Sequence, residues 1–481
     1  MSNSKPSLQF WILFVISISV LIRLLSLGLY PLMDTTEARY GEMARLMVET
    51  NNWVTPYFDY GVPFLGKPPM FIWLSAISFK LFGINEFAAR FPSLICALLN
   101  LFVLWKLASF AMDRTRASIT VMVLITSAAF LVLAGAVLAD PVMTLSISLI
   151  LSAFWIGWHS TDPMQARRWQ YLFYVGCGIA LLAKGLAAIV LAGGPIFFWC
   201  LFRKQLLSFW HRFPWIKGTL LTLAIALPWY LAAEAENPGL IEYMFIGEHF
   251  SRYLDSGWQG DEYGNAHVHP LGSIWGYLLL GGTPWSLVII GLVIYQVKRG
   301  LFKHQQQDLT DWHYFLFCWL LFLPIFFTFT NNLIWTYMLP VTPALALLIA
   351  ALWPMNNDQP NKGLFWFSAV TPVLMIITVV LMMNDGGQKS QKYIFDALNN
   401  KVPNQSGNII YFMDRPFSAR FYSNGTALLA DNQSELTESL TEHQDILVTK
   451  KKFIAHLPEG TLKNFRKEHQ YRDWILFIER K

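Results

Sequence analysis

Charged side chains are scarce in this chain of 481 residues. Asp, Glu, Lys and Arg make up 14% of the sequence, whereas a soluble globular domain carries about 25%. Hydrophobic residues reach 54%, and the mean hydropathy is positive. The composition therefore excludes an ordinary soluble enzyme and indicates a protein with many membrane-spanning helices.

Cysteines and ligand-binding loops are also few. The four cysteines, Cys96, Cys177, Cys200 and Cys318, lie inside apolar segments without metal-ligand spacing, so we interpret them as small buried hydrophobes. No glycine-rich phosphate loop is present, which argues against a soluble nucleotide sugar as a substrate. The net charge of +5 comes mostly from short loops, so no nucleic-acid partner is expected.

Eleven apolar runs are candidate membrane spans, because a bilayer core of about 30 Å needs about 20 helical residues. They are 9–29, 88–108, 117–137, 142–159, 170–184, 186–202, 216–233, 273–296, 312–330, 333–353 and 364–383. The first run has no small-residue cleavage site after it, so we expect a retained helix. The pair on either side of Lys184 is short, which favours either a re-entrant hairpin or a tilted pair.

Lysines and arginines gather in alternate loops. With a cytoplasmic N-terminus, the inside loops contain residues such as Arg114, Arg167 and Lys298, while the short outside connections after the first loop contain only Lys184 and Arg252. Because cytoplasmic loops carry the Lys/Arg excess, we predict a bacterial inner-membrane protein with its N-terminus in the cytoplasm and its C-terminal tail in the periplasm.

The chain divides into a predicted transmembrane domain, residues 1–383, and a predicted periplasmic α/β domain, residues 384–481. The tail alternates polar segments with β-prone runs. Its predicted strands are 408–413, 427–430, 446–449 and 474–478, with a helix at 433–442. The transmembrane domain has two long outer loops, about 30–87 and 234–272. The first should contain an amphipathic helix lying on the membrane, Glu37–Thr50, and an aromatic segment, Met70–Phe82.

Ionisable residues cluster on the outer side. They are Asp34, Glu37 and Arg39 with Tyr40 after the first span, Lys67, Asp140, Lys184, and Glu248, His249, Arg252, His267 and His269 in the second long loop. Charges at membrane depth usually mark a substrate path or catalytic centre. We therefore expect these groups to meet in one outward-facing cavity.

Simpler interpretations remain open for several of these residues. Asp140 before Pro141 could cap a helix, Lys184 could reach toward the membrane surface, and Lys67 could be a solvated loop lysine. Glu248, His249, His267 and His269 could bind a divalent metal such as zinc, although loop histidines are more often solvated.

The residue set suits one type of reaction. Cations at the membrane face can neutralise the phosphate of a lipid-linked substrate, and a carboxylate can activate an acceptor hydroxyl that attacks a sugar carbon. Together they predict an inverting sugar transfer.

Nine short motifs give the chain a resemblance to a known family. They are 34–42, 52–56, 66–69, 81–90, 138–143, 183–185, 247–253, 284–286 and 337–340. In this order, up to about residue 353, the chain resembles the bacterial lipid A aminoarabinose transferases and the wider group of protein-mannosyltransferase-like membrane glycosyltransferases.

The resemblance implies a GT-C fold of about 11–13 transmembrane helices and a polyprenyl-phosphate-linked sugar such as an undecaprenyl-phosphate donor. The acceptor would be lipid A, lipopolysaccharide or another glycan, or a protein. It implies catalytic roles for Asp34, Glu37 and Asp140. It also implies donor-phosphate binding by Lys67, Arg39, Tyr40, Lys184 and Arg252, with zinc or magnesium as a possible cofactor near Glu248.

Two positions depart from the family pattern, and other functions stay open. Relatives often have two adjacent acids before the Arg-Tyr pair, where this chain has Thr36 and Glu37, and aminoarabinose transferases tend to have an acid where Gly66 stands. A transporter or flippase would place its charges nearer the bilayer midplane and in repeated, broken helices. A non-catalytic binding protein or a glycan ligase would also be compatible with parts of the pattern.

Overall fold

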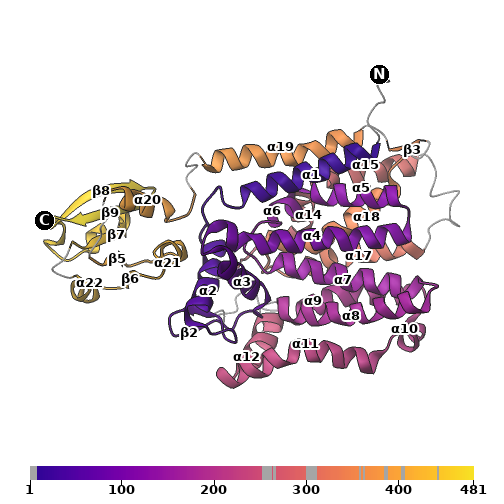
Figure 1. Ribbon diagram of the computed structural model, residues 1–481, viewed down its shortest axis with the longest axis horizontal. Coiled ribbons are helices and arrows are strands. Elements are labelled where there is room, and N and C mark those ends of the chain that lie inside the picture. The colour runs from indigo at the N-terminus through magenta and orange to yellow at the C-terminus, as the bar shows by residue number, and fades with distance from the viewer. Residues whose placement is uncertain are drawn as a thin grey trace.

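A helical bundle and a small α/β domain lie end to end (Figure 1). The structure is a computed structural model that describes residues 8–251, 263, 267–298, 311–356, 359–360, 363–383, 388–401, 407–440 and 444–480. The predicted class, a helical membrane bundle with a small α/β domain after it, is confirmed. The N-terminus and the α/β domain lie at opposite ends of the bundle.

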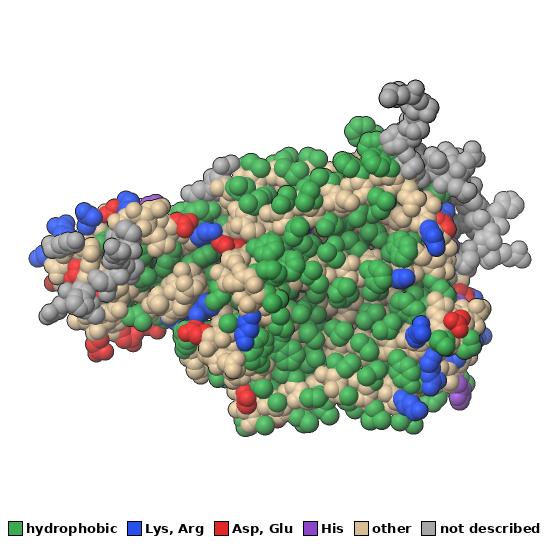
Figure 2. All heavy atoms as spheres, in the orientation of Figure 1, with side chains coloured by type: hydrophobic (Ala, Val, Ile, Leu, Met, Phe, Trp, Pro, Cys, Tyr) green, Lys and Arg blue, Asp and Glu red, His purple; other side chains and the backbone are tan. Residues whose placement is uncertain are grey.

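Long apolar helices form the bundle. They are α1 (Leu8–Ser26), α4 (Glu86–Ala111), α7 (Asp140–His159), α8 (Pro163–Lys184), α9 (Leu186–Phe202), α11 (Trp215–Glu236), α17 (Asp311–Thr328), α18 (Thr342–Leu352) and α19 (Gly363–Met383). Within the described residues, seven helical segments are long and apolar enough to cross a membrane, or eight if one bent pair counts as a span. Apolar side chains cover much of the bundle surface in Figure 2, including exposed ones on α1, α11 and α19. The chain is therefore a multi-pass membrane protein.

Two predicted spans are broken. The run 117–137 forms α5 (Arg114–Ile125) and α6 (Ala128–Leu133), because the hydroxyls of Thr126 and Ser127 bind the carbonyls of the preceding turn. The run 273–296 forms α14 (Ser273–Gly281) and α15 (Trp285–Lys298), which meet at an angle of 97°. A continuous helix was the wrong prediction in both cases.

The span before Lys184 is longer than predicted. Helix α8 has 22 residues because the Asp162 carboxylate accepts hydrogen bonds from the Met164 and Gln165 amides and starts the helix at Pro163. Its partner α9 has 17 residues. A short segment was therefore the right expectation for α9 and the wrong one for α8. Helix α10 (Leu206–Arg212) and the 3-10 helix η2 (Trp335–Val341) complete the bundle.

Two helices from the first long loop cover one end of the bundle. Helix α2 (Thr36–Thr50) and helix α3 (Met70–Phe82) flank a short hairpin of β1 (Tyr57–Asp59) and β2 (Val62–Pro63). The apolar residues of α2 are buried, and the helix packs on α3 and on α21 (Phe417–Tyr422). The apolar face predicted to lie on the membrane is thus covered by protein.

The remaining short elements lie in the second long loop and in the connection between α18 and α19. They are α12 (Leu240–Glu242), the π-helix η1 (Tyr243–Ser251), β3 (Met355–Asn356) and β4 (Gln359–Pro360).

The α/β domain contains a five-stranded sheet in the order β6-β5-β7-β9-β8. Its strands are β5 (Ile409–Phe412), β6 (Ala427–Ala430), β7 (Ile446–Lys450), β8 (Phe465–Tyr471) and β9 (Trp474–Glu479), with β5 parallel to β6 and β7. Its helices are α20 (Lys392–Lys401), α21 and α22 (Gln433–Ser439), with 3-10 turns η3 (Lys451–His456) and η4 (Thr461–Lys463). The four predicted strands are present. Strand β8 was not predicted, because this edge strand is largely polar and exposed.

Polar contacts fix the α/β domain against the outer helices. Lys392 pairs with Glu86 at the start of α4 at 2.6 Å, and Arg415 pairs with Asp59 at 2.7 Å. The Tyr422 hydroxyl accepts a hydrogen bond from the Leu32 amide at 2.8 Å. Residues more than 300 positions apart in sequence therefore build one surface.

Adjacent glycines in α9 provide a test of the bundle packing. A Cβ at Gly194 would lie 2.0 Å from Cζ of Phe322 on α17, whereas a Cβ at Gly193 would meet no atom within 4 Å. We expect Gly194→Ala to destabilise the protein by about 1–3 kcal/mol through overpacking. Gly193→Ala should be neutral or stabilising by up to about 1 kcal/mol. Thermal unfolding of both purified variants in detergent measures the difference, and equal melting temperatures would contradict the α9–α17 contact.

Candidate active site

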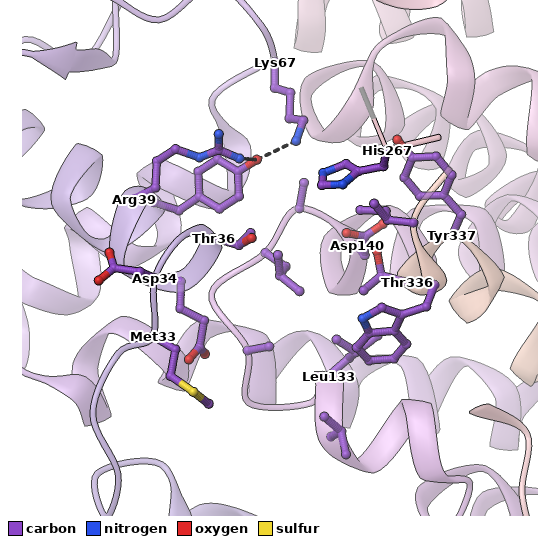
Figure 3. Close-up of a pocket in the computed structure, with 18 of the residues that line it drawn as sticks. Met33, Asp34, Thr36, Arg39, Lys67, Leu133, Asp140, His267, Thr336 and Tyr337 are labelled. Carbon is purple, nitrogen blue, oxygen red and sulfur yellow. Dashed lines mark hydrogen bonds between the residues drawn. The ribbon is translucent and has the colours of Figure 1, made fainter. Parts of the chain in front are cut away.

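A cavity of about 600 Å³ lies where the outer helices meet the membrane bundle. The predicted site residues that line it are Asp34, Glu37, Arg39, Tyr40, Lys67, Asp140, Lys184, Glu248, His267 and His269. Figure 3 shows Lys67, Arg39, Thr36, Asp140 and His267 around this space. The structure thus brings together residues from α2, α7, α8 and three loops, as expected from their shared side of the membrane.

One flank of the cavity is apolar. Leu133 from α6 and Met375, Val379 and Met382 from α19 line it. An amphiphile with a polar head and a hydrocarbon chain matches this division of the lining.

Two cations flank the Tyr40 hydroxyl at the polar side. The Lys67 ammonium donates a hydrogen bond to this hydroxyl, so Lys67 is not a freely solvated loop residue. The Arg39 guanidinium donates to the same hydroxyl at 3.3 Å and to the Tyr263 carbonyl at 2.8 Å. Within the described part of the chain, neither cation forms an ion pair with a carboxylate. Both are therefore positioned to accept an anion from a ligand.

The charge of these cations changes the acidity of Tyr40. Burial alone would raise the pKa of the phenol, but the positive charges of Lys67 and Arg39 outweigh burial and lower the pKa of Tyr40 to about 8. The shift reports the positive potential at this side of the cavity.

Asp140 and Lys184 form an ion pair across two helices. Lys184 Nζ lies 2.8 Å from Asp140 Oδ1 and 4.4 Å from the centre of the Tyr337 ring. The helix-cap interpretation of Asp140 is wrong, because Ala139 is the N-cap of α7 and no side chain caps that end. Lys184 turns into the cavity rather than toward the membrane surface.

Glu37 is held by a buried arginine. Arg90 on α4 contacts both carboxylate oxygens, at 3.0 and 2.8 Å, and donates three more hydrogen bonds to the carbonyls of Leu27, Tyr30 and Pro31. A carboxylate with both oxygens bound to a guanidinium is poorly suited to remove a proton. The geometry therefore favours a positioning role for Glu37 over the predicted catalytic one.

Asp34 turns toward the α/β domain. Its carboxylate accepts hydrogen bonds from the amide and the hydroxyl of Ser418, and its amide donates to the Lys389 carbonyl at 2.7 Å. Figure 3 shows the carboxylate pointing away from Lys67 and Asp140. Burial is the largest influence and raises the pKa of Asp34 to about 6, even though the Ser418 hydrogen bonds act in the opposite direction.

The predicted metal ligands are only partly described. Glu248, His267 and His269 line the cavity, but no three His, Cys, Asp or Glu residues of the described ranges are close enough to hold a metal ion. The His249 side chain and Arg252 lie outside the described residues. The metal site therefore stays a prediction.

Several known proteins are similar to this chain in sequence. The family profile of dolichyl-phosphate-mannose-protein mannosyltransferases matches residues 7–244. A Shewanella sediminis undecaprenyl phosphate-alpha-4-amino-4-deoxy-L-arabinose arabinosyl transferase is 30% identical over 345 residues, which is 72% of this chain and 60% of that protein. A Proteus mirabilis protein of the same description is 30% identical over 376 residues, 76% of this chain and 64% of that protein.

Solved structures match over nearly the whole chain. The crystal structure of ArnT from Cupriavidus metallidurans bound to undecaprenyl phosphate aligns with a TM-score of 0.78 and 18% identity, over 97% of this chain and 98% of that chain. In sequence and in fold, the chain is similar to the protein-mannosyltransferase-like membrane glycosyltransferases. An Archaeoglobus fulgidus oligosaccharyltransferase aligns with a TM-score of 0.52 and 13% identity over 92% of this chain and 70% of that one. The predicted GT-C fold is confirmed.

The chain covers only part of the length of its sequence relatives. The chain spans about 60% of the length of the curated relatives it matches. Gly66, the position at which the family resemblance implies an acid, is closely surrounded, because a Cβ there would lie 3.2 Å from the Phe64 ring and 3.3 Å from Tyr263. This chain therefore has no acidic ligand at that position and little space for one.

Sequence reasoning missed the partners of the predicted acids. Arg90 is 53 positions from Glu37, and Ser418 is 384 positions from Asp34. Arg90 is the last residue of the 81–90 motif, and an ionisable residue in an apolar helix is itself a signal of a functional or structural role. Ser418 had no local signal.

The Arg90–Glu37 pair predicts a strong effect on stability. Arg90→Met leaves the Glu37 carboxylate, whose side chain is 14% exposed, without its cation, which should cost about 3 kcal/mol. The double variant Arg90→Met/Glu37→Met removes both charges and should recover part of that loss. Melting temperatures in detergent compare the two, and a double variant no more stable than Arg90→Met would contradict the pairing.

The raised pKa of Asp34 predicts a pH-dependent contribution to stability. The folded state keeps the proton up to about pH 6, whereas an unfolded aspartate releases it near pH 3.8. The contribution of the Asp34 carboxyl to the free energy of unfolding is therefore fully present below pH 3.8 and is lost as the pH rises through about 6. Asp34→Asn keeps an acceptor for Ser418 without the charge, so its melting temperature should rise relative to wild type more at pH 7.5 than at pH 4.5. The same difference at both pH values would show that Asp34 does not titrate in this range.

Proposed function

We propose that the chain is an inner-membrane glycosyltransferase that moves a sugar from a polyprenyl-phosphate donor, such as undecaprenyl phosphate, to an acceptor on the periplasmic side. The acceptor would be lipid A, lipopolysaccharide or another glycan. The observation that carries the proposal is a pair of cations, Lys67 and Arg39, that have no carboxylate partner among the described residues. They lie beside the Asp140–Lys184 pair in a cavity with one apolar flank.

Related proteins support the choice of donor. The ArnT structure that shares this fold contains undecaprenyl phosphate, and the sequence relatives are described as undecaprenyl phosphate-aminoarabinose transferases. The apolar flank formed by Leu133 and α19 suits an isoprenoid chain. Lys67 and Arg39 suit its phosphate, because an ammonium and a guanidinium together can neutralise a leaving phosphate.

The proposed reaction is a single displacement. An acceptor oxygen attacks the anomeric carbon, the bond from this carbon to the phosphate oxygen breaks, and the phosphate leaves with its charge held by Lys67 and Arg39. The acceptor proton passes to a carboxylate. Asp140 is our candidate for this base. Lys184 contacts its Oδ1 atom, so the second carboxylate oxygen can take the proton, whereas Glu37 is bound to Arg90 through both oxygens.

The two ends of the bundle support the orientation that we propose. The cavity, the outer helices and the α/β domain lie at one end, and α10 lies at the other, beside the Lys- and Arg-bearing connections (Figure 1, Figure 2). Because positive loops stay in the cytoplasm, we propose a cytoplasmic N-terminus and a periplasmic α/β domain.

Two substitutions separate donor binding from chemistry. Lys67→Ala should weaken undecaprenyl phosphate binding at least tenfold and reduce transfer, because it removes a phosphate contact. Asp140→Asn should leave donor binding within twofold of wild type and lower turnover by about 10²–10⁴. Lys80→Ala, an exposed lysine on α3 that does not line the cavity, is the matched control.

The measurements are donor binding to purified protein and single-turnover transfer in proteoliposomes. Mass spectrometry of lipid A, surface glycans and exported proteins from a deletion strain identifies the sugar and the acceptor. Wild-type donor affinity in Lys67→Ala, or wild-type turnover in Asp140→Asn, would refute the corresponding role.

A further inference from the structure

A second cavity, of about 370 Å³, lies between the α/β domain and the chain segment that joins α1 to α2. It is lined by residues of that segment, by the entry to the α/β domain at 388–391, and by the β7 and β9 ends of the sheet. The interface is closed nearby, where Phe58 packs on Phe417 at 5.1 Å and Phe79 on Phe421 at 6.1 Å between ring centres. The space is therefore a local feature of an otherwise packed interface.

The lining is polar and of mixed charge. Its cations are Lys389, Arg415, Lys450 and Arg472, and its acids are Asp34, Asp414 and Asp473. Arg415 is paired with Asp59 and Lys450 with Asp414, so Lys389 and Arg472 are the cations that we assign to a ligand. Lys389, Arg472 and Asp473 are exposed at the rim, so a solute can reach them from water. Cations bind phosphate oxygens, and carboxylates accept hydrogen bonds from hydroxyl groups. A molecule that carries both phosphate and hydroxyl groups matches this lining.

Aromatic side chains form part of the wall. Tyr471 and Trp474 line the cavity, and the Lys450 ammonium lies 5.0 Å from the centre of the Trp474 ring. A flat apolar wall beside a few polar groups is typical of small-molecule sites. Together with the charges it fits a phosphorylated sugar.

Asp34 connects this cavity to the active site. It lines both cavities, and Ser418 fixes its carboxylate. The segment from Met33 to Thr36 is therefore a shared wall, with the polyprenyl side on one face and the α/β domain on the other. An acceptor held in the second cavity would therefore lie next to the segment that borders the donor cavity.

We propose that this interdomain cavity binds the phosphorylated sugar headgroup of the acceptor, and that Lys389 and Arg472 determine acceptor specificity. The proposal rests on the proposed transferase function. It assigns a role to the α/β domain, which supplies most of the lining. The donor remains in the larger cavity, where α19 provides the apolar flank.

A soluble probe tests the site without catalysis. Glucosamine disaccharide bisphosphate without acyl chains should bind the purified full-length protein, measured by calorimetry. The double variant Lys389→Ala/Arg472→Asn should weaken this binding at least tenfold. Asn is chosen because residue 472 has φ of 51°, a left-handed conformation that Asn tolerates. The Lys389 carbonyl that accepts from Asp34 is backbone, so the substitution retains that contact.

A second double variant serves as the control. Lys463→Ala/Arg466→Gln removes two exposed cations from the same domain, outside the cavity, and should bind the disaccharide like wild type. Undecaprenyl phosphate binding should stay within twofold of wild type in both double variants. In transfer assays with lipid A, the cavity variant should raise KM at least tenfold and leave kcat nearly unchanged.

The outcomes separate this inference from the proposed function. No disaccharide binding to wild type, equal loss in both double variants, or loss of undecaprenyl phosphate binding in the cavity variant would overturn the acceptor site. If the disaccharide binds as expected but wild type does not bind undecaprenyl phosphate, the proposed donor is wrong while the sugar-phosphate site is supported.

Discussion

One buried guanidinium organises the end of the bundle that carries the cavity. Arg90 uses all five of its N–H donors, two on Glu37 and three on carbonyls of the turn after α1. Its charged group also lies 3.9 Å from the centre of the Tyr30 ring. The path of the chain from α1 into α2 is therefore set by α4, and Asp34, Arg39 and Tyr40 take their positions from that path.

The acids and cations of the cavity have unequal partners. Glu37 is bound to Arg90, Asp140 to Lys184, and Asp34 to a serine of another domain. Arg39 and Lys67 instead share a phenol hydroxyl and lower its pKa. Among the described residues, Lys67 and Arg39 have no carboxylate partner, so their charge is available for a phosphate. This division underlies our assignment of the donor phosphate to Lys67 and Arg39.

Much of the fold was predictable from apolar runs, because a membrane span needs a length of hydrophobic residues that few other structures require. The break at Thr126 was not predictable, since the apolar pattern continues through it. The break before Pro284 had a signal in Gly281, Gly282 and Pro284, which are poor helix formers, but the apolar length of the run outweighed it in our prediction. The site residues were found from their motifs and shared side of the membrane. Their partners were not, because the pairing of Asp34 with Ser418 or Glu86 with Lys392 depends on tertiary packing across more than 300 residues. As a result, the sequence assigned catalytic chemistry to Glu37 and Asp34, where the structure shows engaged carboxylates.

The docking of the α/β domain has a consequence for biogenesis. A chain synthesised from its N-terminus inserts α1 and makes the turn containing Leu32 and Asp34 long before Ser418 and Tyr422 leave the ribosome. Until then, the Leu32 amide and the Asp34 carboxylate lack their native partners. The wall between the two cavities is therefore completed only at the end of translation, which links maturation of the membrane domain to folding of the α/β domain.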